Sequence, residues 1–347
     1  MRLPGYDERR LIEPLALLDG MAAVAAVRSG DALPLAGGQA YCLARLIDGG
    51  TARLVAARDL PDDWRDVASR LVAAPPVWAG LGPAPEVMGI LNITPDSFSD
   101  GGDRSDPARA VEAGRAMVAA GAGLLDIGGE STRPGSAPVP AEREQARILP
   151  VVHALRDCGV PLSVDTRNAS TMAAALDAGA TIVNDVSGLA HDPEAAALVA
   201  ARGCPVVLMH MRGTPATMTG LAGYMDVAVE VTRELGDRVR AAEAAGIKRG
   251  QIILDPGIGF AKTVSHSLEM IRRLPLLLNL GCRILVGASR KSFISGVADT
   301  VPPKGRLPGS LAAGLFALSR GASILRVHDV AETVQAARIW QALRAGA

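Results

Sequence analysis

Eight short apolar runs recur from about Glu86 onward, and each is followed by a polar loop and, in most cases, an Ala-rich stretch of helix length. Most runs, such as "VMGILNI", "PVVLMHM" and "QIILDPG", are continuously apolar, which is typical of parallel strands buried on both faces. An open doubly wound sheet usually has fewer strands and a GxGxxG nucleotide motif after the first, and no such motif follows "VMGILNI". Eight units therefore predict an α/β fold, a (βα)8 TIM barrel.

The N-terminal part lacks this alternation and predicts a small α+β appendage. A helix-like stretch runs from near Leu11 to Arg28, and a second one lies around Trp64 to Ala73. Between them, "AYCLARLI" and "ARLVAARDL" read as two strands, and the "DGG" that joins them is a hairpin signal. A Pro-rich connector, "APPVWAGLGPAPE", then leads into the barrel. We expect residues 1–80 to form the appendage, whose role the sequence does not indicate, and residues 81–347 to form the barrel.

The charge balance and the cysteines exclude several classes of partner and site. Lys plus Arg and Asp plus Glu both number 36, so nothing indicates a broad surface for nucleic acid or an anionic membrane. Acids, Pro4 and Pro14 interrupt the N-terminal stretch where a secretory signal needs an apolar run. The four cysteines form no CxxC pair, which argues against a zinc site and a disulfide framework. We expect a cytoplasmic protein that binds small molecules.

Polar residues follow nearly every predicted strand, where a TIM barrel builds its active site. They include, in chain order, Asn92, Asp96, Phe98, Asp126, the loop "GGESTRPG", Asp165, Asn184, Asp185, His210, Arg212, Asp255, the loop "SRKS", Arg326 and His328. An Asp or Asn at such a position is often only a helix cap. Asn92, Asp165, Asn184 and Asp255 instead lie inside or at the tip of apolar runs, where an unpartnered polar group costs about 1–3 kcal/mol. Four such residues predict that a ligand supplies partners.

These side chains divide into two chemical groups. One group suits the edge of a flat heterocycle with amide and amino functions: Asp165, Asn184, Asp255 and Lys291. The other suits phosphate or diphosphate, together with backbone N–H groups of a Gly-containing loop: Arg133, Arg326 and His328. Asn92 adds a neutral oxygen that a Mg²⁺ ion held by phosphate oxygens would accept, because Mg²⁺ takes few protein ligands.

Residues 86–347 resemble the dihydropteroate synthases of the pterin-binding barrel family. The stretches that carry the resemblance are "GILNITPDSFSDGG", "DIGGESTRPG", "SVDT", "NDVSG", "LMHMRGTP", "DPGIGFAK", "GASRKSFI" and "RVHDV". Each is weak alone, but their order along eight units is highly specific. The resemblance implies a transferase of folate biosynthesis that joins 4-aminobenzoate to 6-hydroxymethyl-7,8-dihydropterin diphosphate, releases diphosphate and forms 7,8-dihydropteroate. Sulfonamides, which mimic 4-aminobenzoate, are implied as inhibitors, and a homodimer as the assembly.

The resemblance also implies roles for individual residues. The pterin would bind Asp165, Asn184, Met209, Asp255 and Lys291. The diphosphate would meet Asn92, Thr132, Arg133, Arg326 and His328, with Mg²⁺ on Asn92. The 4-aminobenzoate would contact Phe98, Arg133, Lys291 and Ser292. The catalytic residues would be Asp165, Arg133, Lys291 and Asp96, and the loops after the first two strands would close over the substrates.

Two departures and three alternatives accompany this interpretation. Ile258 stands where an aromatic residue is common in the family, and Ala261 stands where Gly is common. A methyltetrahydrofolate-dependent methyltransferase would share the deep pterin acids but would have no need of diphosphate ligands. A non-catalytic pterin-binding homologue would have lost catalytic positions, and none is lost here. A phosphosugar aldolase or isomerase, with Lys291 as a Schiff-base lysine, stays open on fold grounds.

Overall fold

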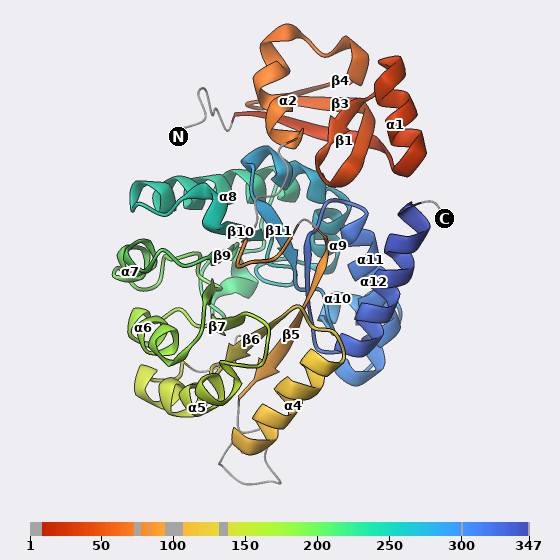
Figure 1. Cartoon of the computed structure of the whole chain (residues 1–347). Coiled ribbons are helices and arrows are strands. Elements are labelled where there is room, and N and C mark those ends of the chain that lie inside the picture. The colour runs from red at the N-terminus through yellow and green to blue at the C-terminus, as the bar shows by residue number, and fades with distance from the viewer. Residues whose placement is uncertain are drawn as a thin grey trace.

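Eight parallel strands close into a barrel, which confirms the predicted architecture (Figure 1). The computed structural model describes residues 9–72, 78–82, 84–93, 107–131, 138–299 and 301–345. The barrel strands are β5 (Glu86–Asn92), β6 (Leu124–Gly128), β7 (Leu162–Asp165), β8 (Ile182–Asp185), β9 (Val206–Met209), β10 (Ile252–Asp255), β11 (Arg283–Val286) and β12 (Ile324–Val327). Each predicted apolar run forms one strand. The pairing of β12 with β5 closes the circle.

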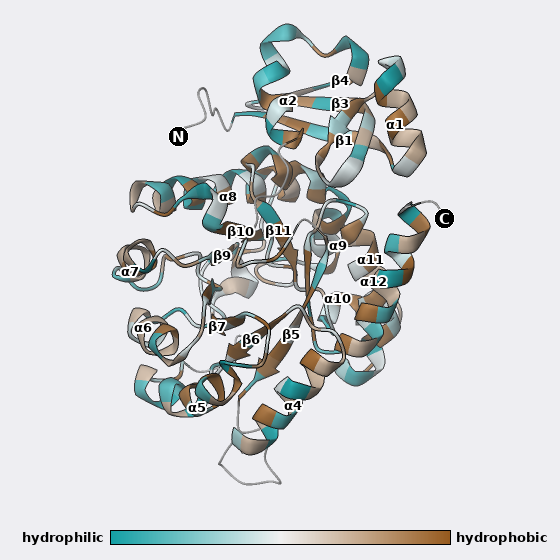
Figure 2. Cartoon of the chain, viewed as in Figure 1, coloured by the Kyte–Doolittle hydropathy of each residue, from teal (hydrophilic) through white to brown (hydrophobic). Residues whose placement is uncertain are grey.

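Helices surround the barrel and cover the apolar outer faces of its strands, which are brown in Figure 2. They are α4 (Pro107–Ala119), α5 (Ala141–Leu155), α6 (Ala169–Ala178), α7 (Ala195–Arg202), α8 (Val227–Ala244), α9 (Val264–Arg272), α10 (Ser292–Ser295), α11 (Leu307–Leu318) and α12 (Val330–Ala345). The 3-10 helix η6 (Leu274–Leu280) precedes β11. Almost every strand residue is buried, as expected where helices cover a parallel sheet.

The N-terminal ends of the strands are closed by a tryptophan from the connector. Trp78 is 1% exposed, and its indole N–H donates to the Gln251 carbonyl oxygen over 2.9 Å. Its ring packs in a cluster with inward-facing residues of the strands: Met88, Leu124, Ile182, Val207, Ile253, Leu285 and Ile324. This apolar cluster closes the end of the barrel opposite the polar strand ends. Trp78 thus contributes to the barrel although it precedes the predicted boundary at residue 81.

The appendage is a four-stranded antiparallel sheet with two helices, and one sequence prediction about it is wrong. Residues 10–18 form strand β1 (Arg10–Leu18), whereas the predicted helix begins only at α1 (Gly20–Ser29). The apolar, Leu-rich stretch is compatible with a helix locally, but pairing with β3 (Gln39–Asp48) decides its conformation. The other elements follow the prediction: β3 and β4 (Thr51–Ala56) form the hairpin, and α2 (Arg65–Val72) is the second helix. A short strand, β2 (Leu33–Leu35), pairs with the start of β3.

The appendage packs tightly on the barrel through η6, all seven of whose residues are buried. The Asn279 side chain takes the place of a neighbouring strand beside β1. Its Nδ2 donates to the Ile12 carbonyl oxygen over 2.8 Å, and its Oδ1 accepts the Ile12 N–H over 3.0 Å. Glu13, also of β1, pairs with Arg273. Figure 1 shows the appendage at one end of the barrel, above α8. These contacts satisfy backbone groups of an edge strand, which would otherwise be open.

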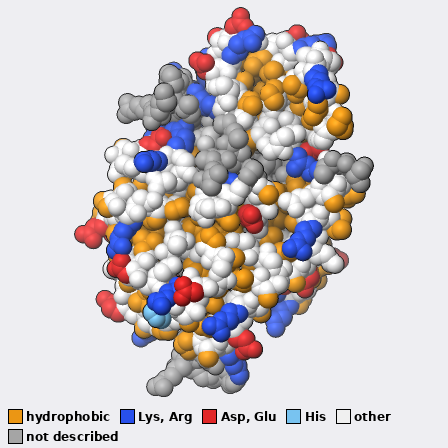
Figure 3. Space-filling model, viewed as in Figure 1, with side chains coloured by type: hydrophobic (Ala, Val, Ile, Leu, Met, Phe, Trp, Pro, Cys, Tyr) orange, Lys and Arg blue, Asp and Glu red, His pale blue; other side chains and the backbone are white. Residues whose placement is uncertain are grey.

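The face of the molecule seen in Figure 3 carries both signs of charge. In the view of Figure 3, acidic and basic side chains are scattered among apolar and neutral ones, in agreement with the net charge of zero. Within the described residues, no helix combines the length and the apolar character that crossing a membrane requires. All four cysteines are free thiols.

Candidate active site

Strand register brings several predicted site residues to the C-terminal end of the barrel. Asn92 is the last residue of β5 and lies opposite Gly128 of β6, which in turn lies opposite Asp165 of β7. Asp165 lies opposite Asn184 of β8. On the far side, Asp255 of β10 lies opposite Met209 of β9. Asn92, Asp165 and Asn184 are thus joined by continuous register, while Asp255 lies two residues further along its strand, and all four are at the C-terminal ends of their strands.

A network of four side chains crosses the interior at this end of the barrel. Arg326 Nε donates to Asp126 Oδ2 over 2.6 Å, and Arg326 Nη2 donates to Asp165 Oδ2 over 2.7 Å. Asn184 Nδ2 also donates to Asp126 Oδ2, over 2.9 Å. Asp126 is fully buried, and no described group donates to its other oxygen, Oδ1. Buried acceptors normally have a donor, so a ligand N–H group is a suitable partner for it.

Asp126 and Asp165 share one cation, Arg326, and this arrangement affects the pKa of Asp165. Burial raises the pKa of Asp165 to about 7; the Arg326 charge opposes the rise, and the neighbouring Asp126 charge adds to it. The pKa of Arg326 itself is raised, because the attraction of Asp126 and Asp165 outweighs the effect of burial. A carboxyl group with a pKa near neutrality can be ionised by a ligand that brings N–H donors or positive charge. A carboxyl group with such a pKa at a barrel mouth is a candidate catalytic residue.

Lys291 and Asp255 provide a second pair of opposite charges nearby. Lys291 is the N-cap residue of α10, and its Nζ lies 4.0 Å from the centre of the Phe260 ring. Burial lowers the pKa of Lys291 to about 8, although the charges of Asp255 and Asp165 oppose this. Burial raises the pKa of Asp255, whose Oδ1 accepts the Gly257 N–H over 2.7 Å. The structure therefore brings together Asp165, Asn184 and Asp255, and it brings Lys291 within electrostatic reach of both acids.

His328 and Arg290 lie on the rim beside Arg326. The Ser289 hydroxyl oxygen accepts the His328 backbone N–H over 3.2 Å and lies 3.1 Å from His328 Nδ1. The hydroxyl can thus donate to Nδ1, which leaves the ring proton on Nε2. Burial and the charges of Arg290 and Arg326 lower the pKa of His328 to about 4, so the free ring is neutral at pH 7. Arg290 has a φ of 58° and is fixed by Asp329, 3.0 Å from its Nε.

Four titratable side chains near the loops that follow β9 and β10 are linked by hydrogen bonds: Lys262, His210, Glu234 and Arg212. They were assigned no role from the sequence. His210 Nε2 lies 2.9 Å from Glu234 Oε2, and its Nδ1 lies 2.9 Å from Lys262 Nζ. Burial lowers the pKa of Lys262 to about 7 and that of His210 to about 4. Arg212 also bonds Glu234. The sequence signal was present in "LMHMRG" and "GFAK", but the partner acid lies within helix α8 and could not be identified from local spacing.

The backbone beside Asp255 explains one departure from the family pattern. Gly257 has a φ of 66°, and a Cβ atom built there would lie 2.0 Å from the His210 carbonyl oxygen, so this position needs glycine. Ala261 has a φ of 46°, a left-handed conformation that glycine adopts without strain. At this position the chain keeps a glycine-like backbone conformation with an alanine side chain.

The remaining predicted site residues are distributed as follows. Met209 is buried with Val186, Met218 and Phe260, and forms an apolar wall. Ser292 is exposed at the first position of α10. Asp96, Phe98, Thr132 and Arg133 lie outside the described residues. Their assigned contacts with 4-aminobenzoate and diphosphate therefore stay predictions. Arg326, predicted for diphosphate, bonds two carboxylates, and its role toward diphosphate also stays a prediction.

The donor set around Asn92 fits a Mg²⁺ ion that depends mainly on phosphate. Among the described residues, no group of three or more His, Cys, Asp or Glu side chains could hold a metal ion by itself. Asn92 is half-buried at the tip of β5 and can offer one amide oxygen toward the mouth. Mg²⁺ commonly keeps several waters and binds through one or two protein oxygens plus substrate phosphates. The described residues are therefore compatible with a metal that arrives with a diphosphate.

The comparison with protein families agrees with this geometry. The family of pterin binding enzymes matches residues 88–328, which span the barrel from β5 to the rim histidine. A dihydropteroate synthase of Synechocystis sp. is 45% identical over 258 residues, which cover 74% of this chain and 89% of that protein. The Escherichia coli K12 dihydropteroate synthase is 45% identical over 259 residues and is covered to 91%. The match leaves the appendage uncovered.

Solved structures give the same result. A dihydropteroate synthase of Xanthomonas albilineans, solved with 4-aminobenzoic acid, superposes with a TM-score of 0.72 at 47% identity, covering 76% of this chain and 94% of that one. The same enzyme solved with 7,8-dihydropteroate gives a TM-score of 0.69 at 44% identity. Identity at this level over nearly the whole of each relative favours the synthases over the other pterin-binding, aldolase and isomerase alternatives. The chain belongs to the pterin-binding enzymes and, among them, to the dihydropteroate synthases, which are transferases.

Proposed function

We propose that the barrel mouth joins 4-aminobenzoate to 6-hydroxymethyl-7,8-dihydropterin diphosphate and releases diphosphate and 7,8-dihydropteroate. The observation that carries this proposal is the group of polar side chains at the strand ends. Asp165 lies opposite Asn184, Asp126 and Arg326 bond to them, and Asp255 is within electrostatic reach of Arg326 and Lys291. A pterin presents alternating donors and acceptors along one edge. The carboxylates, the amide and the lysine provide the complementary pattern, and Met209 provides an apolar surface for the ring.

Asp165 has the properties needed to stabilise positive charge on the pterin. Its pKa of about 7 in the free protein means that bound pterin N–H groups can shift it to the carboxylate. As the bond between the pterin methylene carbon and the diphosphate oxygen breaks, positive charge develops on the pterin, and a carboxylate at this position offsets it. The arylamine nitrogen of 4-aminobenzoate then forms the new C–N bond and loses a proton. Lys291 helps to orient the pterin through its three donors.

The leaving diphosphate would be held on the rim. His328 with its Nε2 proton, Arg326 through its unused donors, and Arg133 and Thr132 of the adjacent loop are the groups we assign to it. Asn92 would share a Mg²⁺ ion with the diphosphate, and the bound ion would supply positive charge at the departing oxygens. Diphosphate binding should also return His328 toward its protonated form, because the neighbouring cations that lower its pKa would then be neutralised.

A direct assay tests the reaction. The purified chain is supplied with the pterin diphosphate, 4-aminobenzoate and Mg²⁺, and dihydropteroate is measured by liquid chromatography. Asp165→Asn should reduce turnover at least about a hundredfold, because it removes the charge that stabilises the pterin cation. Asp62→Asn, which alters an exposed carboxylate of the appendage, should leave turnover unchanged. Absence of product from the wild-type chain would overturn the proposal, and full activity of Asp165→Asn would overturn the role of this residue.

We also infer a homodimer and a cytoplasmic location. Large apolar side chains are exposed on neighbouring helices of the barrel: Leu268 on α9, Phe316 on α11, and Ile339 and Leu343 on α12. A second copy of the chain is the proposed cover, and analytical ultracentrifugation at micromolar concentration tests it. The four free thiols support a reducing compartment.

The Yersinia pestis dihydropteroate synthase has been solved with a sulfonamide drug. We propose that a sulfonamide competes with 4-aminobenzoate for this protein too.

A further inference from the structure

A cavity lies at the junction of the barrel and the appendage, and its appendage side falls outside the region that the family match covers. Its volume is about 260 Å³. The appendage contributes Glu13, Ala16 and Arg45 to its wall, and the barrel contributes Arg272, Arg273 and Arg320. Neither part of the chain encloses this space alone. The cavity therefore exists only in a synthase that carries this appendage.

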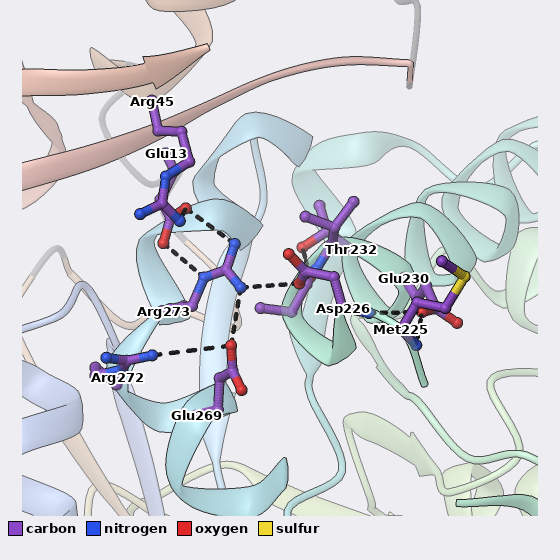
Figure 4. A network of polar contacts seen from close by, with 11 residues as sticks. Glu13, Arg45, Met225, Asp226, Glu230, Thr232, Glu269, Arg272 and Arg273 are labelled. Atoms are coloured by element: carbon purple, nitrogen blue, oxygen red, sulfur yellow. Dashed lines mark hydrogen bonds and ion pairs between the residues drawn. The ribbon is translucent and has the colours of Figure 1, made fainter. Parts of the chain in front are cut away.

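Arg273 holds the cavity wall together and has no capacity left for a ligand. Its guanidinium meets both Glu13 oxygens, at 2.6 and 2.9 Å, and also Asp226 at 2.9 Å and Glu269 at 3.0 Å. Figure 4 shows it between Glu13 of β1 and Asp226 at the start of α8. The pKa of Arg273 is raised by these carboxylates against the effect of burial. The Glu13 charge is thus used within the protein, and Glu13 is only 2% exposed.

The other three arginines are paired less completely than Arg273. Arg45 shares Glu13 with Arg273 and leaves 42% of its side chain exposed. Arg272 is 68% exposed and reaches Glu269 only at 3.8 Å. Arg320 stacks on the Phe316 ring, and its buried Nε has no hydrogen-bond partner among the described residues. Four arginines line this space, and three carboxylates, Glu13, Asp226 and Glu269, pair with them, so one positive charge is left over and a bound anion would offset it.

The backbone of β1 is distorted where it borders the cavity. Ala16 has a φ of 51°, which is left-handed, and the register of β1 with β3 is interrupted at this residue. A non-glycine residue held in this conformation is strained, and such strain is concentrated at ligand sites and turns. Ala16 is in the middle of a strand, so a turn does not explain it. This observation is independent of the charges and points to the same cavity.

We propose that this junction cavity binds a small phosphate-bearing anion. Arginine presents a planar fork of donors that matches phosphate oxygens, and several forks around one space favour an ion with multiple negative charges. The volume is below the range that holds drug-sized ligands, which favours phosphate, diphosphate or the phosphate group of an ester. The site is distinct from the barrel mouth, because helix α9 runs from the mouth side to Arg272 over nine residues, about 13 Å.

Isothermal titration calorimetry on the full chain tests the proposal. Inorganic phosphate, diphosphate and ATP are titrated separately in a phosphate-free buffer of low ionic strength, and sodium acetate serves as the monovalent control. At least one phosphate compound should bind with an affinity that falls as salt is added, because the site is partly exposed. Binding of inorganic phosphate or diphosphate without ATP identifies a free anion as the ligand. Tighter binding of ATP identifies a phosphate ester.

Variants assign the binding to this cavity rather than to the barrel mouth. Arg272→Gln combined with Arg320→Gln should weaken the binding at least about tenfold, since each lost fork removes charge-assisted hydrogen bonds. Arg58→Gln, an exposed arginine elsewhere on the appendage, is the matched control and should bind as the wild type does. Circular dichroism verifies folding, and Arg272→Gln alone replaces the double variant should that one misfold. Superimposable isotherms for wild type and variants, or no phosphate binding at all, would overturn the proposal.

Discussion

Burial is the main cause of the raised pKa of Asp165, the charge on Asp126 adds to it, and the substitution Asp126→Asn tests this second effect. Asp126 Oδ2 accepts hydrogen bonds from both Arg326 and Asn184, while no described donor contacts Oδ1. An asparagine can keep its oxygen at the Oδ2 position and place its amide nitrogen where Oδ1 was. The geometry of the network is therefore retained, and only the negative charge is lost.

The expected cost in stability follows from the contacts. Arg326 loses one of two carboxylate partners but keeps Asp165 at 2.7 Å, so a bond between opposite charges becomes a bond from a charged donor to a neutral amide oxygen. We expect the free energy of unfolding to fall by about 1–3 kcal/mol for Asp126→Asn. Asp126→Ala, which also removes the acceptor and leaves Asn184 without a partner, should cost about 3–5 kcal/mol. Urea denaturation measures both values.

The more specific result concerns pH. Asp126 raises the pKa of Asp165, and Arg326 lowers it. Loss of the Asp126 charge removes the first effect and leaves the whole Arg326 charge to Asp165, so the pKa of Asp165 should fall below its present value of about 7. If the reaction needs ionised Asp165, the acid limb of kcat/KM should move to lower pH in Asp126→Asn. The profile is measured from pH 5 to 9, with Asp62→Asn as the control. A limb that stays in place, or moves to higher pH, would refute this reasoning.

Three further predictions follow from the structure. Glu13→Gln leaves buried Arg273 with only two carboxylate partners, the partly exposed Asp226 and Glu269. The free energy of unfolding, measured by urea denaturation, should fall by about 2–4 kcal/mol. A change below about 0.5 kcal/mol would show that the pair of Glu13 and Arg273 contributes little. Gly257→Ala should abolish activity or soluble expression, because its Cβ would overlap the His210 carbonyl oxygen; a fully active variant would show that the loop can move. Lys291 should lose its charge as pH rises through about 8 rather than near 10.5, so dihydropteroate affinity should fall over pH 7–9 in wild type and stay level in Lys291→Arg.

The sequence predicted those features that depend on local pattern. Eight apolar runs became eight strands, because continuous burial leaves a composition that is visible in each segment. The polar residues at their ends, such as Asp165 and Asn184, came together because equal register follows from the barrel itself. Residues 10–18 were predicted as helix, since the sequence does not show that β3 lies beside them. The Glu13 and Arg273 pair joins positions 260 residues apart, and nothing in either neighbourhood reveals the other. The role of Asp126 depends likewise on two distant partners.

The tryptophan in the connector changes which stretch of sequence is needed to complete the barrel of this enzyme. The family resemblance begins at Met88, yet the barrel interior is sealed by Trp78, ten residues upstream. A gene fragment that begins at Met88 would encode a barrel without Trp78, and the apolar residues at the N-terminal ends of its strands would be exposed to water. Any recombination event that transfers this catalytic core to another protein must therefore carry a short upstream tail with it. The tail also leads to the appendage, and this gives the two parts a reason to be inherited together.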